Sequence, residues 1–329
     1  MLNVLLTGAG NIAGGFDADR PAGLPPLTHA GAYRAHGGFS LLACVEPDPA
    51  RRAAFMARWK VPHGFASLGE ATRAGLRFDV ASLCSPTEAH PADLRAVLEL
   101  GVRLVFCEKP LAPSVAAAQL MVEACRVRGV PLAVNHNRRW DPAVQRMGRE
   151  IAAGDWGALR CATGHYNKGV LNNGTHLIDL MHLLLGPLTL TAVGRPEHDH
   201  WPADPSVPMM LEAQGRPVLV NCGHAADYSL FELQLVFERG VVAIEAGGLR
   251  WRTRRATPSS EFAGYTVLDD GLLVEGSYLA CMSRAVDNLH RTLTGGASLA
   301  STGDSALMAQ QLAAAALERA LRSHLGSTA

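Results

Sequence analysis

The first residues of the chain have the composition and spacing of a phosphate-binding turn. An apolar run over residues 1–6 leads directly into Gly8-Ala9-Gly10-Asn11-Ile12-Ala13, a Gly-x-Gly-x-x-Ala pattern. After a buried strand, such a turn makes room for the pyrophosphate of a dinucleotide, because Gly8 permits a tight turn and Gly10 lets the backbone approach the phosphates. Small Ala13 lets the following helix pack closely, and the N-terminus of that helix attracts an anion. The pattern predicts a dinucleotide site, with an ordinary strand-to-helix turn as the alternative.

An acidic residue ends the second predicted strand. Residues 40–45 are apolar, and Glu46 follows them directly. A carboxylate in this position can accept hydrogen bonds from the adenosine ribose hydroxyls and would repel a 2′-phosphate, which favours NAD over NADP. The alternative is a solvated loop acid. Between the two strands, residues 16–27 are rich in Pro and Gly and cannot continue a helix, so they are predicted to form an insertion beside the phosphate site.

The composition excludes several classes of partner and compartment. The 329 residues suit two domains, and 48% hydrophobic residues with a formal net charge of zero favour neither nucleic acid nor an anionic membrane as a partner. The longest apolar stretches are shorter than the ~18 residues that span a bilayer. The first strand begins at Met1, which leaves no room for a signal peptide, so we expect a cytoplasmic protein.

The cysteines and histidines indicate neither a disulfide framework nor a metal site. The seven cysteines include no Cys-x-x-Cys pair, which favours reduced thiols. Cys84 and Cys107 lie at apolar strand ends, and we expect both to be buried. The sequence His198-Asp199-His200 could hold a metal, but its flanking prolines predict a loop, and we expect no metal.

Residues 1–135 alternate between apolar strands and helical segments, which predicts a parallel sheet. We expect strands at residues 1–6, 40–45, 78–84, 102–106 and 130–134 and helices at residues 49–59, 91–100 and 114–128. Beyond residue 141, strands joined by Gly-containing turns predict an antiparallel sheet. We expect its strands at residues 159–166, 209–212, 218–222, 230–238, 241–246 and 266–274, and helices at 142–153, before Gly186 and at 305–325. The fold class is therefore α/β, with domains at residues 1–135 and 136–329.

Further motifs accompany the glycine turn and carry a resemblance to a known family. These motifs are Ser85-Pro86-Thr87 with His90, Glu108-Lys109-Pro110, Asn137-Arg138-Arg139-Trp140 and Gly174-x-His176-x-x-Asp179. Together they resemble the Gfo/Idh/MocA oxidoreductases over the whole chain. The resemblance implies a Rossmann dinucleotide-binding domain followed by an α+β domain with an open, mainly antiparallel sheet. It also implies an NAD(P)-dependent dehydrogenase or reductase that acts on CH–OH groups and forms a homo-dimer or homo-tetramer through the second sheet.

The resemblance implies the positions of the cofactor site, with NAD expected and NADP less favoured. Most of these positions follow strand ends of the first domain, where open α/β sheets bind ligands. They are Gly8, Gly10, Asn11, Ile12, Glu46, Ser85, Pro86, Thr87, His90, Glu108, Lys109, Asn137 and Arg138.

Lys109 and His176 are the catalytic residues that the resemblance implies. Hydride transfer from an alcohol needs a group that removes the hydroxyl proton, and His176 suits this role because imidazole titrates near neutral pH. Lys109 can hold the reacting oxygen and stabilise its developing negative charge. Asp179 shares a helix face with His176 and could orient the imidazole or bind a substrate hydroxyl. Considered singly, a helix-start histidine and a surface lysine are the alternatives.

Asn172 departs from the family pattern, in which an aspartate often precedes the histidine by four residues. An amide cannot accept the proton, but it can bind a sugar hydroxyl, so we expect Asn172 to contact substrate and Asn172→Asp to be tolerated. Residues 166–169 resemble a branch of the family found with nucleotide-sugar and surface-polysaccharide pathways. That likeness implies Tyr166 and Lys168 as substrate contacts, with a strand-end tyrosine and a solvated lysine as the alternatives.

The predicted function is NAD-dependent hydride transfer to or from a hydroxyl or keto carbon of a sugar or sugar derivative, nucleotide sugars included. The direction stays open, because the same residues serve oxidation and reduction. One alternative is an enzyme that retains its nicotinamide between two sugars, with the insertion at residues 16–27 covering the cofactor. Another is a nicotinamide-binding regulator without turnover, which Asn172 weakly favours.

Overall fold

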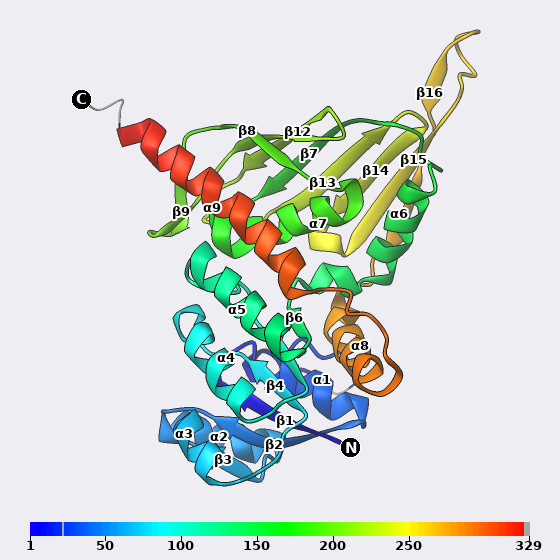
Figure 1. Cartoon of the computed structure of the whole chain (residues 1–329). Coiled ribbons are helices and arrows are strands. Elements are labelled where there is room, and N and C mark those ends of the chain that lie inside the picture. Colours follow the sequence, from blue (N-terminus) through cyan, green and yellow to red (C-terminus); the bar gives the residue numbers. More distant parts are fainter. Residues whose placement is uncertain (22, 326–329) are drawn as a thin grey trace. The chain divides into compact units, whose positions relative to one another are not determined.

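The computed structural model describes residues 1–21 and 23–325 (Figure 1). The chain forms two compact units. Unit 1 comprises Met1–Trp140 and Leu279–Leu307, and unit 2 comprises Asp141–Tyr278 and the segment from Met308 onward. Among the helices of the described residues, none is both long enough and apolar enough to cross a membrane.

Unit 1 is built on a parallel sheet whose strand order reverses at its centre. Over the described residues this sheet has six strands in the order β3-β2-β1-β4-β5-β6. The strands are β1 (Leu2–Thr7), β2 (Phe39–Val45), β3 (His63–Phe65), β4 (Val80–Leu83), β5 (Leu104–Cys107) and β6 (Leu132–Val134). The chain switches direction across the sheet between β1 and β4, and open α/β sheets bind ligands beside the carboxyl ends of the strands at such a switch. This Rossmann-type sheet confirms the predicted fold class.

Five helices flank this sheet within the described residues. They are α1 (His29–His36), α2 (Pro49–Trp59), α3 (Leu68–Arg73), α4 (His90–Glu99) and α5 (Val115–Arg128). All but α4 are capped by a side chain at their first turn. Thr28, Asp48, Ser67 and Ser114 each accept a backbone N–H from the first turn of the helix that follows. Such caps satisfy N–H groups that have no partner within the helix, which explains where these helices begin.

The glycine turn is not followed directly by a helix. After a hydrogen-bonded turn the chain forms a short 3₁₀ segment at Gly15–Asp17, and α1 begins only at His29. The three prolines within residues 16–27 prevent a continuous helix there, as the sequence predicts. The expectation of a helix beginning at the turn is therefore wrong. Ala13 instead lies in the core of unit 1, where its carbonyl accepts the N–H of Ala30.

Residues 279–307 return to unit 1, whereas the sequence pattern places the whole of residues 136–329 in the second domain. This segment forms α8 (Cys281–Gly295), which packs against α1. One face of α8 is apolar and lies in the same core as β1 and β4, through Met282, Ala285, Val286 and Leu289. The boundary cannot be found by dividing the chain once, because the segment that completes the core is distant in sequence.

Unit 2 contains a large sheet that is antiparallel apart from the pairing of β7 with β12. Within the described part of the chain it has nine strands, ordered β16-β15-β14-β13-β7-β12-β11-β8 with β17 on β15. The strands are β7 (Leu159–Tyr166), β8 (Thr189–Val193), β11 (Met209–Ala213), β12 (Arg216–Cys222), β13 (Phe231–Phe237), β14 (Gly240–Glu245), β15 (Arg250–Pro258), β16 (Thr266–Leu268) and β17 (Leu272–Glu275). Buried and exposed residues alternate along β11 and β13, so one face lies in the core and the other faces solvent.

The buried face of this sheet packs against helices. They are α6 (Pro142–Ala152), α7 (Thr175–Leu185) and the part of α9 (Gly303–Leu325) that belongs to unit 2, and their apolar residues share one core with the strands. A separate hairpin, β9 (Glu197–Trp201) with β10 (Asp204–Ser206), contains the sequence His198-Asp199-His200. The expected loop at these residues is therefore a strand.

Candidate functional site

The strand-end cavity is a hollow in unit 1 that gathers several predicted site residues. It has a volume of about 560 Å³ and lies at the carboxyl ends of β1, β2 and β4. The predicted residues Gly8, Glu46, Ser85 and Pro86 line it together. Its other lining residues are Thr7, Val45, Pro47, Asp48, Arg51, Ala66, Ser67, Leu68, Ala89 and Asp93.

The two glycines of the turn have different structural requirements. Gly8 has a φ of +78°, and a Cβ atom there would lie 2.6 Å from the carbonyl oxygen of Cys84 at the end of β4. Gly10 meets nothing within 4 Å of its would-be Cβ. Gly8 therefore serves the fold, whereas Gly10 leaves open space over its backbone. That open space fits a pyrophosphate, which must approach the backbone closely. Asn11 and Ile12 follow on the same turn, exposed and half-buried.

Glu46 ties the glycine turn to the start of α2. Its Oε2 accepts the backbone N–H of Ala9 at 3.0 Å, and its Oε1 accepts that of Asp48 at 3.1 Å. Arg51 Nε lies 3.8 Å from the same carboxylate. An ionised carboxylate offers about four acceptor positions, so these contacts leave capacity for ribose hydroxyls on the cavity side. Glu46 is thus both a support of the loop and a suitable ribose acceptor.

The segment after β4 divides into residues that face the cavity and residues that support it. Ser85 Oγ donates to Asp93 Oδ2 at 2.6 Å, and both residues line the cavity. Thr87 is half-buried at the start of a 3₁₀ turn. His90 is buried, with its ring nitrogens 3.1 Å from the Leu111 carbonyl and 3.0 Å from the Ser85 carbonyl. Because its imidazole joins two backbone segments, His90 supports the site and is removed from the predicted cofactor contacts.

The remaining predicted cofactor residues lie after β5 and β6. Lys109 and Asn137 are half-buried, whereas Arg138 is buried within the 3₁₀ turn Asn137–Trp140. Glu108 is buried, and its carboxylate contacts His29 and Asn135 inside the unit. We therefore interpret Glu108 as a residue that supports the site, in place of the predicted contact with the cofactor.

In unit 2, the hairpin β9–β10 fixes the segment that carries the predicted substrate residues. The backbone of Lys168 is left-handed, with φ +68°, and its N–H donates to Asp199 Oδ2 at 2.7 Å. Asp204 accepts the backbone N–H groups of Leu171 and Asn172, each at 2.8 Å. Sequence reasoning missed these two aspartates, because nothing local to residues 199 and 204 shows which distant backbone they bind.

Asn172 has a structural hydrogen bond as well as a place in the candidate site. It lies in the π-helical turn Gly169–Gly174, and its Nδ2 donates to the Lys168 carbonyl at 2.9 Å. The asparagine amide can donate to this carbonyl, whereas an aspartate would place a charged acceptor against it. The expectation that Asn172→Asp is tolerated is therefore revised.

His176 and Asp179 lie one turn apart near the start of α7. His176 is half-buried, whereas Asp179 is 1% exposed. The burial of Asp179 favours an orienting role over a contact with substrate. Tyr166 is completely buried, and its hydroxyl donates to the Val207 carbonyl and accepts the Val207 N–H. Burial raises the pKa of Tyr166 well above its ordinary value, and this core residue is withdrawn from the predicted substrate contacts.

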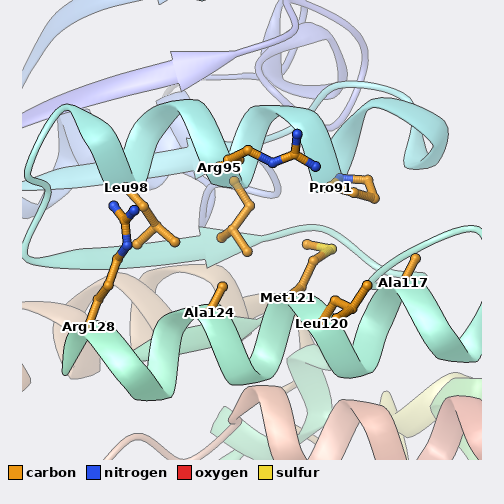
Figure 2. Close-up of a pocket in the computed structure, with 9 residues that line it drawn as sticks. Pro91, Arg95, Leu98, Ala117, Leu120, Met121, Ala124 and Arg128 are labelled. Atoms are coloured by element: carbon orange, nitrogen blue, oxygen red, sulfur yellow. The ribbon is translucent and has the colours of Figure 1, made fainter.

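A second hollow contains none of the predicted site residues. It has a volume of about 310 Å³ and lies between α4 and α5, lined largely by apolar side chains such as Leu94, Leu98 and Met121 (Figure 2). Among the described residues, no group of three or more His, Cys, Asp or Glu side chains is arranged to hold a metal ion. The predicted site residues therefore fall in two places, the strand ends of unit 1 and the segment around the start of α7 in unit 2.

Comparison with known proteins links unit 1 to an oxidoreductase family. Residues 2–136 match the model of the Gfo/Idh/MocA family, described as "Oxidoreductase family, NAD-binding Rossmann fold". The chain is 26% identical over 217 residues to D-apiose dehydrogenase of Paraburkholderia graminis, covering 60% of this chain and 57% of that protein. It is 25% identical over 323 residues to inositol 2-dehydrogenase of Rhizobium meliloti, covering 90% and 94%. The first of these matches spans less than two thirds of its relative's length.

A solved structure shares the fold of the chain. The WlbA dehydrogenase of Bordetella pertussis, in complex with NADH and UDP-GlcNAcA, is 21% identical, with a TM-score of 0.76. The likeness covers 97% of this chain and 96% of that one. At this identity the comparison establishes the fold, and the chemistry depends on this chain's own residues.

Substituting the two glycines tests their different requirements. Gly8→Ala should lower the free energy of unfolding by about 1–3 kcal/mol or more, because it adds a left-handed alanine and a backbone clash. Gly10→Ala should leave stability within about 0.5 kcal/mol, as at other open positions, yet weaken NADH binding at least about tenfold, or about 1.4 kcal/mol. Urea denaturation and titration calorimetry measure the two effects. Equal NADH affinity for Gly10→Ala and the unchanged protein would contradict the phosphate site.

A second test addresses the revised expectation for Asn172. Asn172→Asp removes the donor to the Lys168 carbonyl and adds a charge beside Asp204, so it should destabilise the protein by about 1–3 kcal/mol. Asn172→Ala, which removes the hydrogen bond without adding a charge, is the matched control and should cost less. Chemical denaturation compares the three proteins. Stability of Asn172→Asp equal to that of the unchanged chain would show that the hydrogen bond is dispensable.

Proposed function

We propose that this chain, which belongs through its N-terminal domain to the Gfo/Idh/MocA oxidoreductase family, is an NAD-dependent dehydrogenase or reductase of a sugar or sugar derivative. The observation that carries the proposal is the strand-end cavity, which Gly8 and Glu46 line. On the same turn, Gly10 leaves open space over its backbone. Apiose and inositol, in the names of two relatives, are both polyhydroxylated compounds. When bound, a nicotinamide supplies the hydride acceptor or donor.

The protein's residues then have separate tasks in hydride transfer. Lys109 holds the reacting oxygen and stabilises its negative charge. His176 takes the hydroxyl proton during oxidation or returns it during reduction, and buried Asp179 orients its imidazole. Asn172, as an amide, can hydrogen-bond a substrate hydroxyl.

Lys168 supports a substrate that carries a negative charge. Lysines are rare in this chain: of its 30 Lys and Arg residues, three are lysines, namely Lys60, Lys109 and Lys168. Lys168 is half-buried on a left-handed backbone held by Asp199, beside the α7 segment. The Asp199 contact anchors the backbone of Lys168, and the ammonium that this backbone carries can pair with a phosphate or a carboxylate. A nucleotide sugar or a sugar acid is therefore our preferred substrate class, and the WlbA structure contains a compound of this kind.

The solvent-facing side of the unit 2 sheet supports an assembly of identical subunits. Alternate residues of β11 and β12 face outward and include two large apolar side chains, Met210 and Leu219. We infer a homo-dimer or homo-tetramer formed through this face. Of the described residues in the 16–27 insertion, none lines the strand-end cavity, so the idea of a retained cofactor beneath it lacks support.

Glu46 should set the preference for NAD(H) over NADP(H). Glu46→Ala should weaken NADH binding by about 1–3 kcal/mol, the scale for hydrogen bonds to a charged group. Glu46→Gln keeps an oxygen for the Ala9 N–H but removes the charge and the acceptor for the Asp48 N–H, so it should narrow the preference for NADH over NADPH. Calorimetric titration with NADH and NADPH measures both effects. Equal or tighter binding of NADPH by the unchanged protein would contradict the proposal.

Lys109 and His176 should each be required for turnover. His176→Ala and Lys109→Ala should each lower kcat by ~10²–10⁴, the usual contribution of an acid–base group, while NADH affinity changes little. The double variant should lose less than the product of the two single losses, because residues that act as a unit are not additive. Reduced-nicotinamide absorbance with a panel of polyols, sugar acids and nucleotide sugars measures turnover. Near-normal turnover of either single variant would exclude its residue from the site.

A further inference from the structure

A cluster of buried polar residues lies inside unit 1, next to Lys109 in sequence. His29 Nε2 is 2.8 Å from Glu108 Oε1, and Asn135 Nδ2 donates to the same oxygen at 2.6 Å. His29 is 0%, Asn135 4% and Glu108 7% exposed. These residues come from α1, from the end of β6 and from the end of β5. Three elements that are distant in sequence therefore meet at one carboxylate.

His29 is held in a single orientation by its surroundings. Its Nδ1 lies 3.1 Å from Ser82 Oγ on β4, and Tyr33 shares that oxygen at 2.9 Å. The ring also lies 4.4 Å, centroid to centroid, from the ring of Phe106 on β5. Both imidazole nitrogens are thus engaged, and the Nε2 atom is directed at Glu108.

The insertion at residues 16–27 leads directly into this histidine. Asp17 Oδ2 accepts the backbone N–H of Thr28 at 2.9 Å and its hydroxyl at 2.6 Å, and the same carboxylate accepts the Leu27 N–H. Thr28 in turn caps α1, whose first residue is His29. The buried carboxylate of Asp17 therefore anchors the end of the insertion and fixes where α1 delivers its imidazole.

Glu108 connects the cluster to the backbone of Lys109. Its Oε2 accepts the backbone N–H of Lys109 at 3.3 Å, while Oε1 is held by His29 and Asn135. A carboxylate fixed on one side by two side chains restrains the backbone on its other side. Any rotation of Glu108 would release the N–H at the root of the Lys109 side chain.

The charge state of Glu108 depends on this cluster. Burial raises the pKa of its carboxyl, but hydrogen bonds from His29 and Asn135 and the charges of His29 and Lys109 outweigh burial, so the pKa lies below its ordinary value. The other titratable groups that face the pair are Tyr33 on α1 and the thiols of Cys84 and Cys107. Burial raises the pKa of each of these three groups, which keeps them neutral.

We propose that His29 is a positioning residue, delivered by the 16–27 insertion, that holds the Glu108 carboxylate and through it the backbone of Lys109. The inference rests on the proposed function, in which the Lys109 ammonium meets the reacting oxygen. A displacement of about 1 Å at such a group can lower a rate ~10²-fold. In this proposal the insertion acts on the site from within the core of unit 1.

The first experiment separates positioning from binding. His29→Leu should lower kcat at least about tenfold, whereas KM and the NADH dissociation constant should change less than about threefold, because the loss affects orientation. His29→Gln, whose amide can still donate to Glu108, should recover most of the rate. Normal kcat in His29→Leu, or equal losses in His29→Leu and His29→Gln, would overturn the proposal. If His29→Leu does not fold, Asn135→Ala removes the other donor and takes its place.

The pH profile gives a readout that a purely structural role would not move. Burial raises the pKa of Glu108 and His29 lowers it, so the pKa should rise when His29 is removed. The acidic limb of kcat should then move to higher pH. Glu108→Gln has no carboxyl at this position to titrate, so adding His29→Leu to Glu108→Gln should leave the acidic limb that His176 imposes where it is. An acidic limb at the same pH in His29→Leu and the unchanged protein would contradict the proposal.

The last readout needs no substrate. Reductive ¹³C-methylation labels the three lysines, whose NMR signals can be assigned with Lys→Arg variants. His29→Leu should shift the signal of Lys109 but leave those of Lys60 and Lys168 in place. An unmoved Lys109 signal would overturn the positioning role. A shifted Lys109 signal in a protein that turns over none of the panel would uphold the positioning role and refute the proposed function.

Discussion

The close approach of two strand ends at Gly8 is the constraint on which the rest of unit 1 depends. A Cβ atom at this residue would lie 2.6 Å from the Cys84 carbonyl, so only glycine lets β1 turn against the end of β4. This is where the strand order reverses, which leaves the crevice that becomes the strand-end cavity. Glu46 closes one side of that crevice by binding the turn at Ala9. The cofactor site is therefore a consequence of backbone packing before any ligand is considered.

Both units use carboxylates to organise backbone N–H groups around functional side chains. In unit 1, Glu108 binds the N–H of Lys109, and in unit 2, Asp204 binds the N–H groups that precede His176. Asp199 does the same for Lys168. Buried backbone groups without partners are costly, so each carboxylate both satisfies the chain and restricts its conformations. Acidic residues thus hold the backbone that carries the side chains proposed for chemistry.

The sequence predicts the local features of this molecule well, and it fails where contacts join distant residues. The glycine turn and the parallel strands follow from short-range patterns, and the structure has them. The pairing of His29 with Glu108 joins residues 79 positions apart, and no periodicity encodes it. The sequence does not predict the return of α8 to unit 1 for the same reason, because the contacts that place it there join distant residues. The likeness at residues 166–169 implies Tyr166 as a substrate contact, but the hydrogen bonds to Val207 that fix Tyr166 in the core are long-range.

The most direct test of the account is a crystal structure of the protein with NADH bound. We expect the adenosine in the strand-end cavity, its ribose hydroxyls within hydrogen-bond distance of the Glu46 carboxylate, and the pyrophosphate over the backbone of Gly10. The nicotinamide should then extend toward the ends of β5 and β6. A dinucleotide bound elsewhere in unit 1, or a ribose that avoids Glu46, would contradict the assignment of this cavity as the cofactor site.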